Sequence, residues 1–164
     1  MNKNFFEIEN VSFSVGGKNK VNNVNLSIKN EGDIICLLGP SGIGKTTILR
    51  TIAGLEKIKS GKITLKNKIL SSIDKHVEPE DRNIALSFQE NSLFPHYTVD
   101  KNINLGAERK SGKKSKISVK DIIKFLNLKK ILNKYPHEIS AGEAQRTSLA
   151  RSLVSQPDLL LLDE

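Results

Sequence analysis

Eight consecutive residues, 39–46, have the composition and spacing of a phosphate-binding loop. They read GPSGIGKT and fit the pattern G-x-x-x-x-G-K-[ST]. Glycines at these places let the backbone curl, so that successive N–H groups point toward one anion and the following helix adds the positive end of its dipole. We therefore expect the lysine to reach the β- and γ-phosphates of a nucleotide and the threonine hydroxyl to bind Mg²⁺. The candidate nucleotide-binding residues are Gly39, Pro40, Ser41, Gly42, Ile43, Gly44, Lys45, Thr46 and Thr47.

The segments on either side of this loop fit the interpretation. Residues 34–38 (IICLL) form an apolar run, which predicts a buried strand leading into the loop, and residues 46–55 have the composition of a helix. Cys36 lies within the predicted strand, so we expect a small core residue rather than a reactive thiol. Because it is the only cysteine, no disulfide forms within the chain.

A second candidate site follows the apolar run 159–162, which is directly succeeded by Asp163 and Glu164. Four apolar residues in succession predict a strand covered on both faces of a parallel sheet, whose carboxyl end opens on a ligand crevice. One carboxylate there can hold Mg²⁺ and the other can orient or deprotonate water. The alternative is a core strand that ends in two surface acids.

A third candidate is the turn Ser140-Ala141-Gly142-Glu143 in front of a predicted helix over 143–155. Ser140 can cap that helix, and the N–H groups of its first turn form an anion site. From the residues alone an ordinary N-cap is the preferred interpretation.

The remaining pattern predicts strands first and helices later. Strands are expected over 6–15, with a bulge at Glu9-Asn10, and over 24–28. A hairpin is expected over 62–70 with its turn at Asn67, and a short strand over 84–88. From residue 98 onward the periodicity is helical, with a capping box that begins at Ser118.

The composition excludes several classes of protein. Apolar residues make up 37% and charged residues 27%, which suits a folded, soluble chain. No apolar run approaches the roughly 18 residues of a membrane span, and the N-terminus lacks a signal peptide, so we expect a cytosolic protein. The net charge is +8, but the lysines are dispersed, and the one dense basic segment, 109–116, contains no aromatic residues. A nucleic-acid partner is therefore not expected.

Taken together, the motifs resemble those of the ATP-binding subunit of an ABC transporter, over essentially the whole chain. Residues 39–46 resemble its Walker A loop, 139–143 (ISAGE) its LSGGQ signature and 159–164 its Walker B strand. Gln89 directly follows the predicted strand 84–88, where the family has its Q-loop glutamine. The segment that begins there resembles importers supplied by a substrate-binding protein, of the ferric-iron, polyamine or sugar type.

The resemblance implies an α/β fold: a P-loop NTPase core with an N-terminal antiparallel β part and a helical insertion. It implies one ABC ATPase domain in three parts. Residues 1–98 carry Walker A and the Q-loop, residues 99–140 form the helical subdomain, and residues 141–164 hold the signature helix and the Walker B strand.

The resemblance also implies a mechanism shared by two subunits, with ATP and Mg²⁺ sandwiched head to tail between them. Ser140, Ala141, Gly142 and Glu143 of one subunit would close over the nucleotide that the other subunit's Walker A loop holds. Glu164 would act as general base toward water. Gln89 would sense the γ-phosphate and link it to the membrane subunits. The implied Mg²⁺ ligands are Thr46, Gln89 and Asp163.

The implied partners are a second ATP-binding subunit, transmembrane permease subunits that dock near residues 89–99, and indirectly a substrate-binding protein. The subunit would work at the inner face of the cell membrane. Two alternatives remain at this point. One is a catalytically silent nucleotide-binding module. The other is an ABC-type ATPase that acts on DNA, which the compact interval between Walker A and the signature disfavours, since it carries neither heptads nor zinc-spaced cysteines.

The sequence departs from the family pattern in several places. Val15 takes the place of the aromatic residue that stacks on adenine, with Phe13 as a possible substitute, and Ala141 replaces a signature glycine. No D-loop or switch histidine follows residue 164, and the three histidines all lie earlier, where we expect surface or groove residues. We therefore expect a truncated subunit, missing the last strands and helices, that binds nucleotide with little turnover.

Overall fold

The computed structural model describes residues 4–15, 19–88, 93–108 and 118–163. The chain divides into two compact units, Met1–Arg82 and Asn83–Glu164. The boundaries predicted from the sequence, at 98/99 and 140/141, stay predictions.

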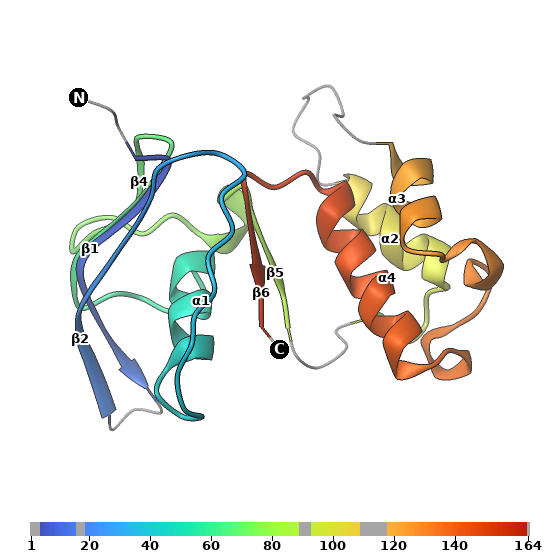
Figure 1. Cartoon of the computed structure of the whole chain (residues 1–164), viewed down its shortest axis with the longest axis horizontal. Helices are drawn as coiled ribbons and strands as arrows, with labels where there is room; N and C mark the ends of the chain where they lie inside the picture. Colours follow the sequence, from blue (N-terminus) through green and yellow to red (C-terminus); the bar gives the residue numbers. More distant parts are fainter. Residues whose placement is uncertain (1–3, 16–18, 89–92, 109–117, 164) are drawn as a thin grey trace. The chain divides into compact units, whose positions relative to one another are not determined.

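The first unit is built on a four-stranded antiparallel sheet in the order β2-β1-β3-β4. Its strands are β1 (Phe6–Val15), β2 (Asn19–Ile28), β3 (Ser60–Leu65) and β4 (Lys68–Ser71) (Figure 1). Alternate side chains of β1 are buried, as the alternating pattern predicts. The register shifts between Ile8 and Val11, and Asn10 has φ of 49°, which confirms the predicted bulge.

The turn between β3 and β4 confirms the predicted hairpin. Lys66 and Asn67, its two central residues, both have left-handed φ values, 48° and 64°. Two such residues in succession give the turn whose twist matches that of the flanking strands. Beyond β4, residues Pro79–Asp81 form the 3₁₀ turn η1.

Helix α1 (Lys45–Ala53) is the predicted helix behind the phosphate-binding loop. It ends at Gly54, whose left-handed φ of 90° lets its N–H return to the carbonyls of Arg50 and Thr51. Burial is confined to its C-terminal turn, where Thr51, Ile52 and Ala53 are enclosed.

The prediction of a strand over 34–38 is wrong. These residues adopt no regular secondary structure, and Ile34 and Leu38 are 89% and 92% exposed. Cys36, expected in the core, is exposed as well. A strand needs a hydrogen-bonded neighbour, and this run pairs with none of the strands that the structure describes. Apolar composition alone therefore did not make a strand here.

The second unit combines a two-stranded parallel sheet with a group of helices. The strands are β5 (Ile84–Ser87) and β6 (Leu159–Leu162), in register from Ile84 with Leu159 to Ser87 with Leu162. The helices are α2 (Val99–Glu108), α3 (Val119–Phe125) and α4 (Ala141–Val154). Two 3₁₀ turns, η2 (Lys129–Ile131) and η3 (Pro136–Glu138), precede α4.

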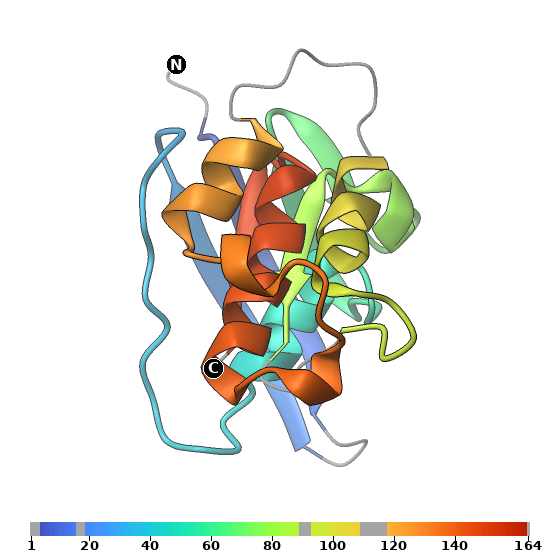
Figure 2. The same cartoon turned by 90° about the vertical axis from the view of Figure 1, so that its right-hand side faces the viewer.

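The helices share one apolar core, and both α2 and α3 contact α4 (Figures 1 and 2). Val99, Ile103 and Leu128 in this core are fully buried. No helix among the described residues is long and apolar enough to cross a membrane.

Strand β6 confirms the predicted parallel pairing but not the predicted burial. Leu161 is buried, whereas Leu162 is 58% exposed. The reason is that β6 has β5 as its one neighbour among the described strands, so the two-stranded sheet does not enclose both of its faces.

Replacing Gly61 by alanine is expected to destabilise the first unit. Gly61 has φ of +85°, and a Cβ there would overlap the carbonyl oxygens of Glu9 and Asn10 at the bulge. Gly32 has a similar φ of +94° with no heavy atom within 4 Å, so Gly32→Ala reports backbone strain alone. In urea unfolding we expect Gly32→Ala to cost about 1 kcal/mol and Gly61→Ala about 3 kcal/mol or more. Equal losses would contradict the close packing at the bulge.

Candidate nucleotide-binding site

The phosphate-binding loop leads into α1 through two glycines with left-handed backbones. Gly42 has φ of 81° and Gly44 has φ of 107°. Gly44 is also the N-cap of α1, and its carbonyl accepts the first helical hydrogen bond, from the N–H of Ile48 at 2.9 Å. Side chains with a Cβ rarely adopt these conformations, so the spacing of glycines in the motif matches the backbone that the loop requires.

The ammonium group of Lys45 is held by the start of the loop. Its Nζ donates hydrogen bonds to the carbonyl oxygens of Gly39, at 2.7 Å, and Pro40, at 3.0 Å. The side chain thus runs back from the first residue of α1 to the start of the loop. A cation is therefore held next to the positive end of α1, which makes this part of the chain attractive to an anion.

The N-terminus of α1 differs from those of α3 and α4 in having no side-chain cap. Gly44 provides no side chain there, and the first turn of α1 carries no acidic residue. The N–H groups at the start of a helix lack intrahelical acceptors. Of these three helices, α1 is the one whose positive end no carboxylate of its own first turn neutralises. Thr46 lies in this first turn and is exposed.

Ser140 and Glu143 form a reciprocal capping box at the start of α4, as expected for an N-cap. The Ser140 hydroxyl accepts a hydrogen bond from the Glu143 N–H at 3.3 Å. The Glu143 carboxylate accepts two, from the Ser140 N–H at 2.8 Å and the Ser140 hydroxyl at 2.9 Å. These two bonds hold the pKa of Glu143 below its ordinary value. Ala141 and Gly142 are the first two residues of the helix.

Asp163 directly follows β6, at the carboxyl end of the parallel pair. Its N–H donates to the carbonyl of Ser87, the last residue of β5, at 3.0 Å. The Ser87 hydroxyl in turn lies 3.5 Å from the Ser148 hydroxyl of α4. The structure therefore places Asp163 where the sequence predicts it, at the end of a parallel strand.

Other predicted site residues are not brought to the site or lie outside the described residues. Gln89 and Glu164 lie outside the described residues. Phe13, the suggested substitute for the adenine-stacking aromatic, is 2% exposed, so its ring packs in the core and this suggestion is wrong. His76 is half-buried and lies 3.1 Å from the carbonyl of Gly54, whereas His137 is exposed.

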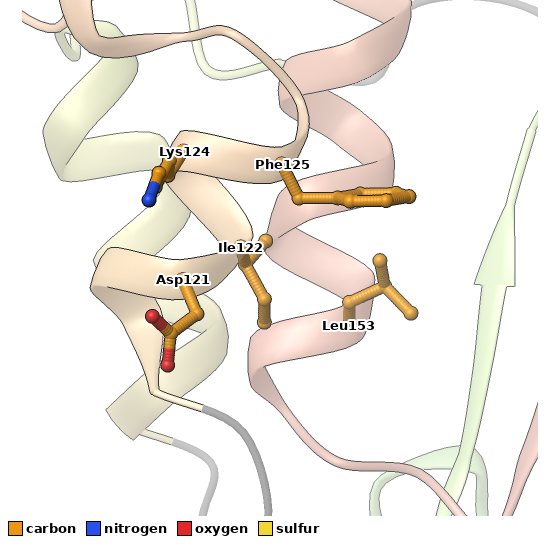
Figure 3. Close-up of a pocket in the computed structure, with 5 residues that line it drawn as sticks. All are labelled: Asp121, Ile122, Lys124, Phe125 and Leu153. Atoms are coloured by element: carbon orange, nitrogen blue, oxygen red, sulfur yellow. The ribbon is translucent and has the colours of Figure 1, made fainter.

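The structure also has an apolar pocket of about 580 Å³ between α3 and α4. Its lining residues are Asp121, Ile122, Lys124, Phe125 and Leu153 (Figure 3). The side chains of Phe125 and Leu153 extend over it, whereas Lys124 points away from them. Such a lining lacks the convergent N–H donors that a triphosphate needs, so this pocket is not the nucleotide site.

Comparison with known proteins decides the family. The sequence profile of the ABC transporter family matches residues 21–164. The chain belongs to the ABC transporter family. This confirms the resemblance predicted from its motifs.

Relatives in this family include import proteins. The chain is 42% identical over 159 residues to the probable sulfate/thiosulfate import ATP-binding protein CysA of Chlorella vulgaris, covering 96% of this chain and 65% of the relative. It is 40% identical over 159 residues to the spermidine/putrescine import ATP-binding protein PotA of Salmonella typhimurium, covering 96% of this chain and 41% of the relative. The chain thus spans less than two thirds of the length of either.

A solved ABC cassette confirms the predicted fold class. The dimeric, post-hydrolysis structure of the ATP-binding cassette MJ0796 bound to ADP and Pi matches with a TM-score of 0.76 at 28% identity. The match covers 97% of this chain and 73% of that one. The fold of this ABC family member is accordingly that of an α/β P-loop NTPase.

Replacing Ser140 by alanine is expected to weaken the start of α4. The change removes the acceptor for the Glu143 N–H and one donor to the Glu143 carboxylate. Loss of such a cap costs about 1 kcal/mol, which urea unfolding followed by circular dichroism can measure. Ser152→Ala, the same chemical change inside α4, is the control and should be neutral or slightly stabilising because alanine favours helix. Equal effects of the two variants would contradict the capping role.

The capping box is also expected to weaken in acid. Because the pKa of Glu143 is lower in the folded chain than in the unfolded chain, its contribution to stability is complete above the ordinary glutamate pKa of about 4.3. That contribution is lost as the pH falls through the lower, native pKa. NMR titration of the Glu143 carboxyl carbon measures this pKa, and Glu143→Gln should remove the dependence. A native pKa at or above the ordinary value would contradict the hydrogen bonds.

Proposed function

We propose that this chain is the ATP-binding and ATP-hydrolysing subunit of an ABC importer. The observation that carries the proposal is the pair of hydrogen bonds that holds the Lys45 ammonium against the loop at the uncapped N-terminus of α1. This arrangement combines a cation, inward-curled backbone and a free helix dipole, which together bind phosphates in P-loop proteins. The two relatives are named as ATP-binding proteins, and the solved cassette is bound to ADP and Pi, which supports the same ligand class.

In this proposal the phosphates bind along residues 39–47, where the loop and the first turn of α1 donate N–H hydrogen bonds. Lys45 exchanges carbonyl acceptors for phosphate oxygens, which form stronger, charge-assisted hydrogen bonds. Thr46, Asp163 and Gln89 are the proposed ligands of Mg²⁺, either directly or through water. When bound, Mg²⁺ neutralises charge that develops on the transferred phosphoryl group.

The proposed reaction is hydrolysis of the terminal phosphate. Glu164 takes a proton from the attacking water as general base. Gln89 senses the γ-phosphate and passes its presence to the membrane partner. Both roles come from the positions of these residues in the family motifs.

A second ATP-binding subunit completes the proposed site. Ser140, Ala141, Gly142 and Glu143 of that subunit close over the γ-phosphate, since the N-terminus of α4 is the second helix end whose N–H groups can face an anion. The dimeric form of the solved MJ0796 cassette supports a second ATP-binding subunit.

Permease subunits in the membrane are the proposed route for the transported solute or ion, fed by a substrate-binding protein. The ATP-binding subunit would dock on them near residues 89–99, at the inner face of the membrane. The names of the two relatives, which import sulfate or thiosulfate and polyamines, support import of a small solute. The proposal includes no nucleic-acid partner.

Replacing Lys45 by alanine is expected to abolish binding of Mg·ATP, because it removes the cation that the loop carbonyls hold. Isothermal titration calorimetry or a fluorescent ATP analogue measures the dissociation constant. We expect a loss of about a hundredfold or more, since hydrogen bonds to charged groups contribute about 1.5–3 kcal/mol each. Lys57→Ala, which removes an exposed lysine outside the loop, is the control and should leave binding unchanged. Tight binding by Lys45→Ala would contradict the proposed site.

A further inference from the structure

Helix α1 is held at the end opposite to the phosphate-binding loop. Its last residues, Thr51 to Ala53, and the following Gly54 are buried, whereas residues 45–50 are exposed or half-exposed. A helix of 9 residues is about 13 Å long and behaves as a short rod. The contacts that fix its C-terminal turn therefore also fix the direction in which the N–H groups of its N-terminal turn point.

Arg82 forms hydrogen bonds to this buried end. Its Nη1 donates to two carbonyls of the last turn, Thr51 at 3.2 Å and Ile52 at 2.7 Å. The same guanidinium reaches the sheet: Nη2 donates to the carbonyl of Leu70 at 3.3 Å and to the hydroxyl of Ser71 at 2.7 Å. Arg82 thus joins the end of α1 to the end of β4.

The side chain has no spare donor. Its Nε donates to the carbonyl of Val77 at 2.7 Å, which brings the hydrogen bonds to five, the number of N–H groups on a guanidinium. Arg82 is 2% exposed, and all five acceptors are neutral oxygens. Among the ion pairs of the described residues none involves Arg82. Burying a cation is costly, and the five hydrogen bonds offset that cost.

The charge of Arg82 matches its position. Burial lowers the pKa of Arg82 to about 10, with Glu78 opposing the shift, so the group is still a cation at neutral pH. A cation at the C-terminal carbonyls of a helix complements the negative end of its dipole. Lysine cannot replace it, because an ammonium has three donors and no planar fork.

Gly54 and His76 also belong to the contact between Arg82 and the end of α1. A Cβ on Gly54 would come within 2.5 Å of the Arg82 Nε, so glycine lets the guanidinium approach the helix end. The His76 ring lies 3.1 Å from the Gly54 carbonyl at this end as well. Residues from β4 to η1 therefore converge on the C-terminal turn of α1.

We propose that Arg82 is a positioning residue for nucleotide binding, which fixes the buried end of α1 so that the phosphate-binding loop at the other end keeps the geometry that phosphates require. This inference rests on the proposed nucleotide site. All five hydrogen bonds of Arg82 go to residues outside the loop, so its proposed effect passes through the helix. The sensitivity of phosphate contacts to small displacements makes the orientation of α1 a determinant of affinity.

The test compares Arg82→Lys with Arg50→Lys in the same chain. Arg50 also belongs to α1, but it is partly exposed and pairs with Glu56 at 3.3 Å. Dissociation constants for Mg·ATP are measured at a temperature at which urea unfolding shows each variant to be folded. We expect Arg82→Lys to weaken Mg·ATP by about tenfold or more and Arg50→Lys to leave it within about twofold, as for an exposed ion pair.

A second, milder variant covers the case in which Arg82→Lys does not fold. Ser71→Ala removes one of the five acceptors of Arg82 and should weaken Mg·ATP by about threefold, less than Arg82→Lys because the other four acceptors remain. Hydrogen exchange adds a readout that a purely structural role would not move. We expect faster exchange of the backbone N–H groups of residues 41–47 in the folded variants, although these residues do not contact Arg82 or Ser71.

The outcomes separate this inference from the proposed function. If the wild-type chain is folded and binds no Mg·ATP, the proposed nucleotide site fails and the role of Arg82 fails with it. If the wild type binds Mg·ATP and the folded variants bind it equally well, with unchanged exchange in the loop, only the positioning role is overturned. A loss of global stability without a change in affinity would likewise overturn it.

Discussion

The chemistry available to this chain depends on a helix end that no side chain caps. At the N-terminus of α1 the preceding residue, Gly44, supplies no oxygen, and the first turn holds no acid. The carbonyls of Gly39 and Pro40 meanwhile hold the Lys45 ammonium close to that end. Positive charge is thus concentrated where the backbone donors are not used by the helix itself. A polyanion is the ligand that satisfies such a site.

The N-termini of α3 and α4, in contrast, are capped by side chains of the same segment. Ser118 caps α3 through the Asp121 N–H, and Ser140 caps α4 in a reciprocal box with Glu143. Each of these ends carries its own carboxylate. In the proposed head-to-tail pair the α4 terminus nevertheless has to meet a γ-phosphate, so the carboxylate of Glu143 and the phosphate compete for the Ser140 hydroxyl. In that proposed pair the two helix ends would therefore differ: the α1 end has no side-chain cap, and the α4 end would have to release an internal hydrogen bond.

Local features of the fold could be predicted from the residues nearby. The bulge at Asn10, the hairpin turn at Asn67 and the Ser140 cap all depend on contacts between residues that are close in sequence or in directly paired strands. Non-local features could not. The apolar run 34–38 has the composition of a buried strand, but a strand exists only when a neighbouring strand supplies hydrogen bonds, and periodicity does not say which neighbour is present. Arg82 belongs to no motif, because its acceptors lie up to 31 residues away.

The sequence by itself determined the kind of chemistry and the family, because glycine, lysine and threonine at set spacings are required by the backbone of the loop, whatever surrounds it. It also predicted that the apolar run before Asp163 is a parallel strand, but not that its neighbour is β5. Only the tertiary structure decided how α1 is anchored. The acceptors of a buried guanidinium are carbonyls that folding brings together. Those of Arg82 come from α1, from β4 and from the segment before η1.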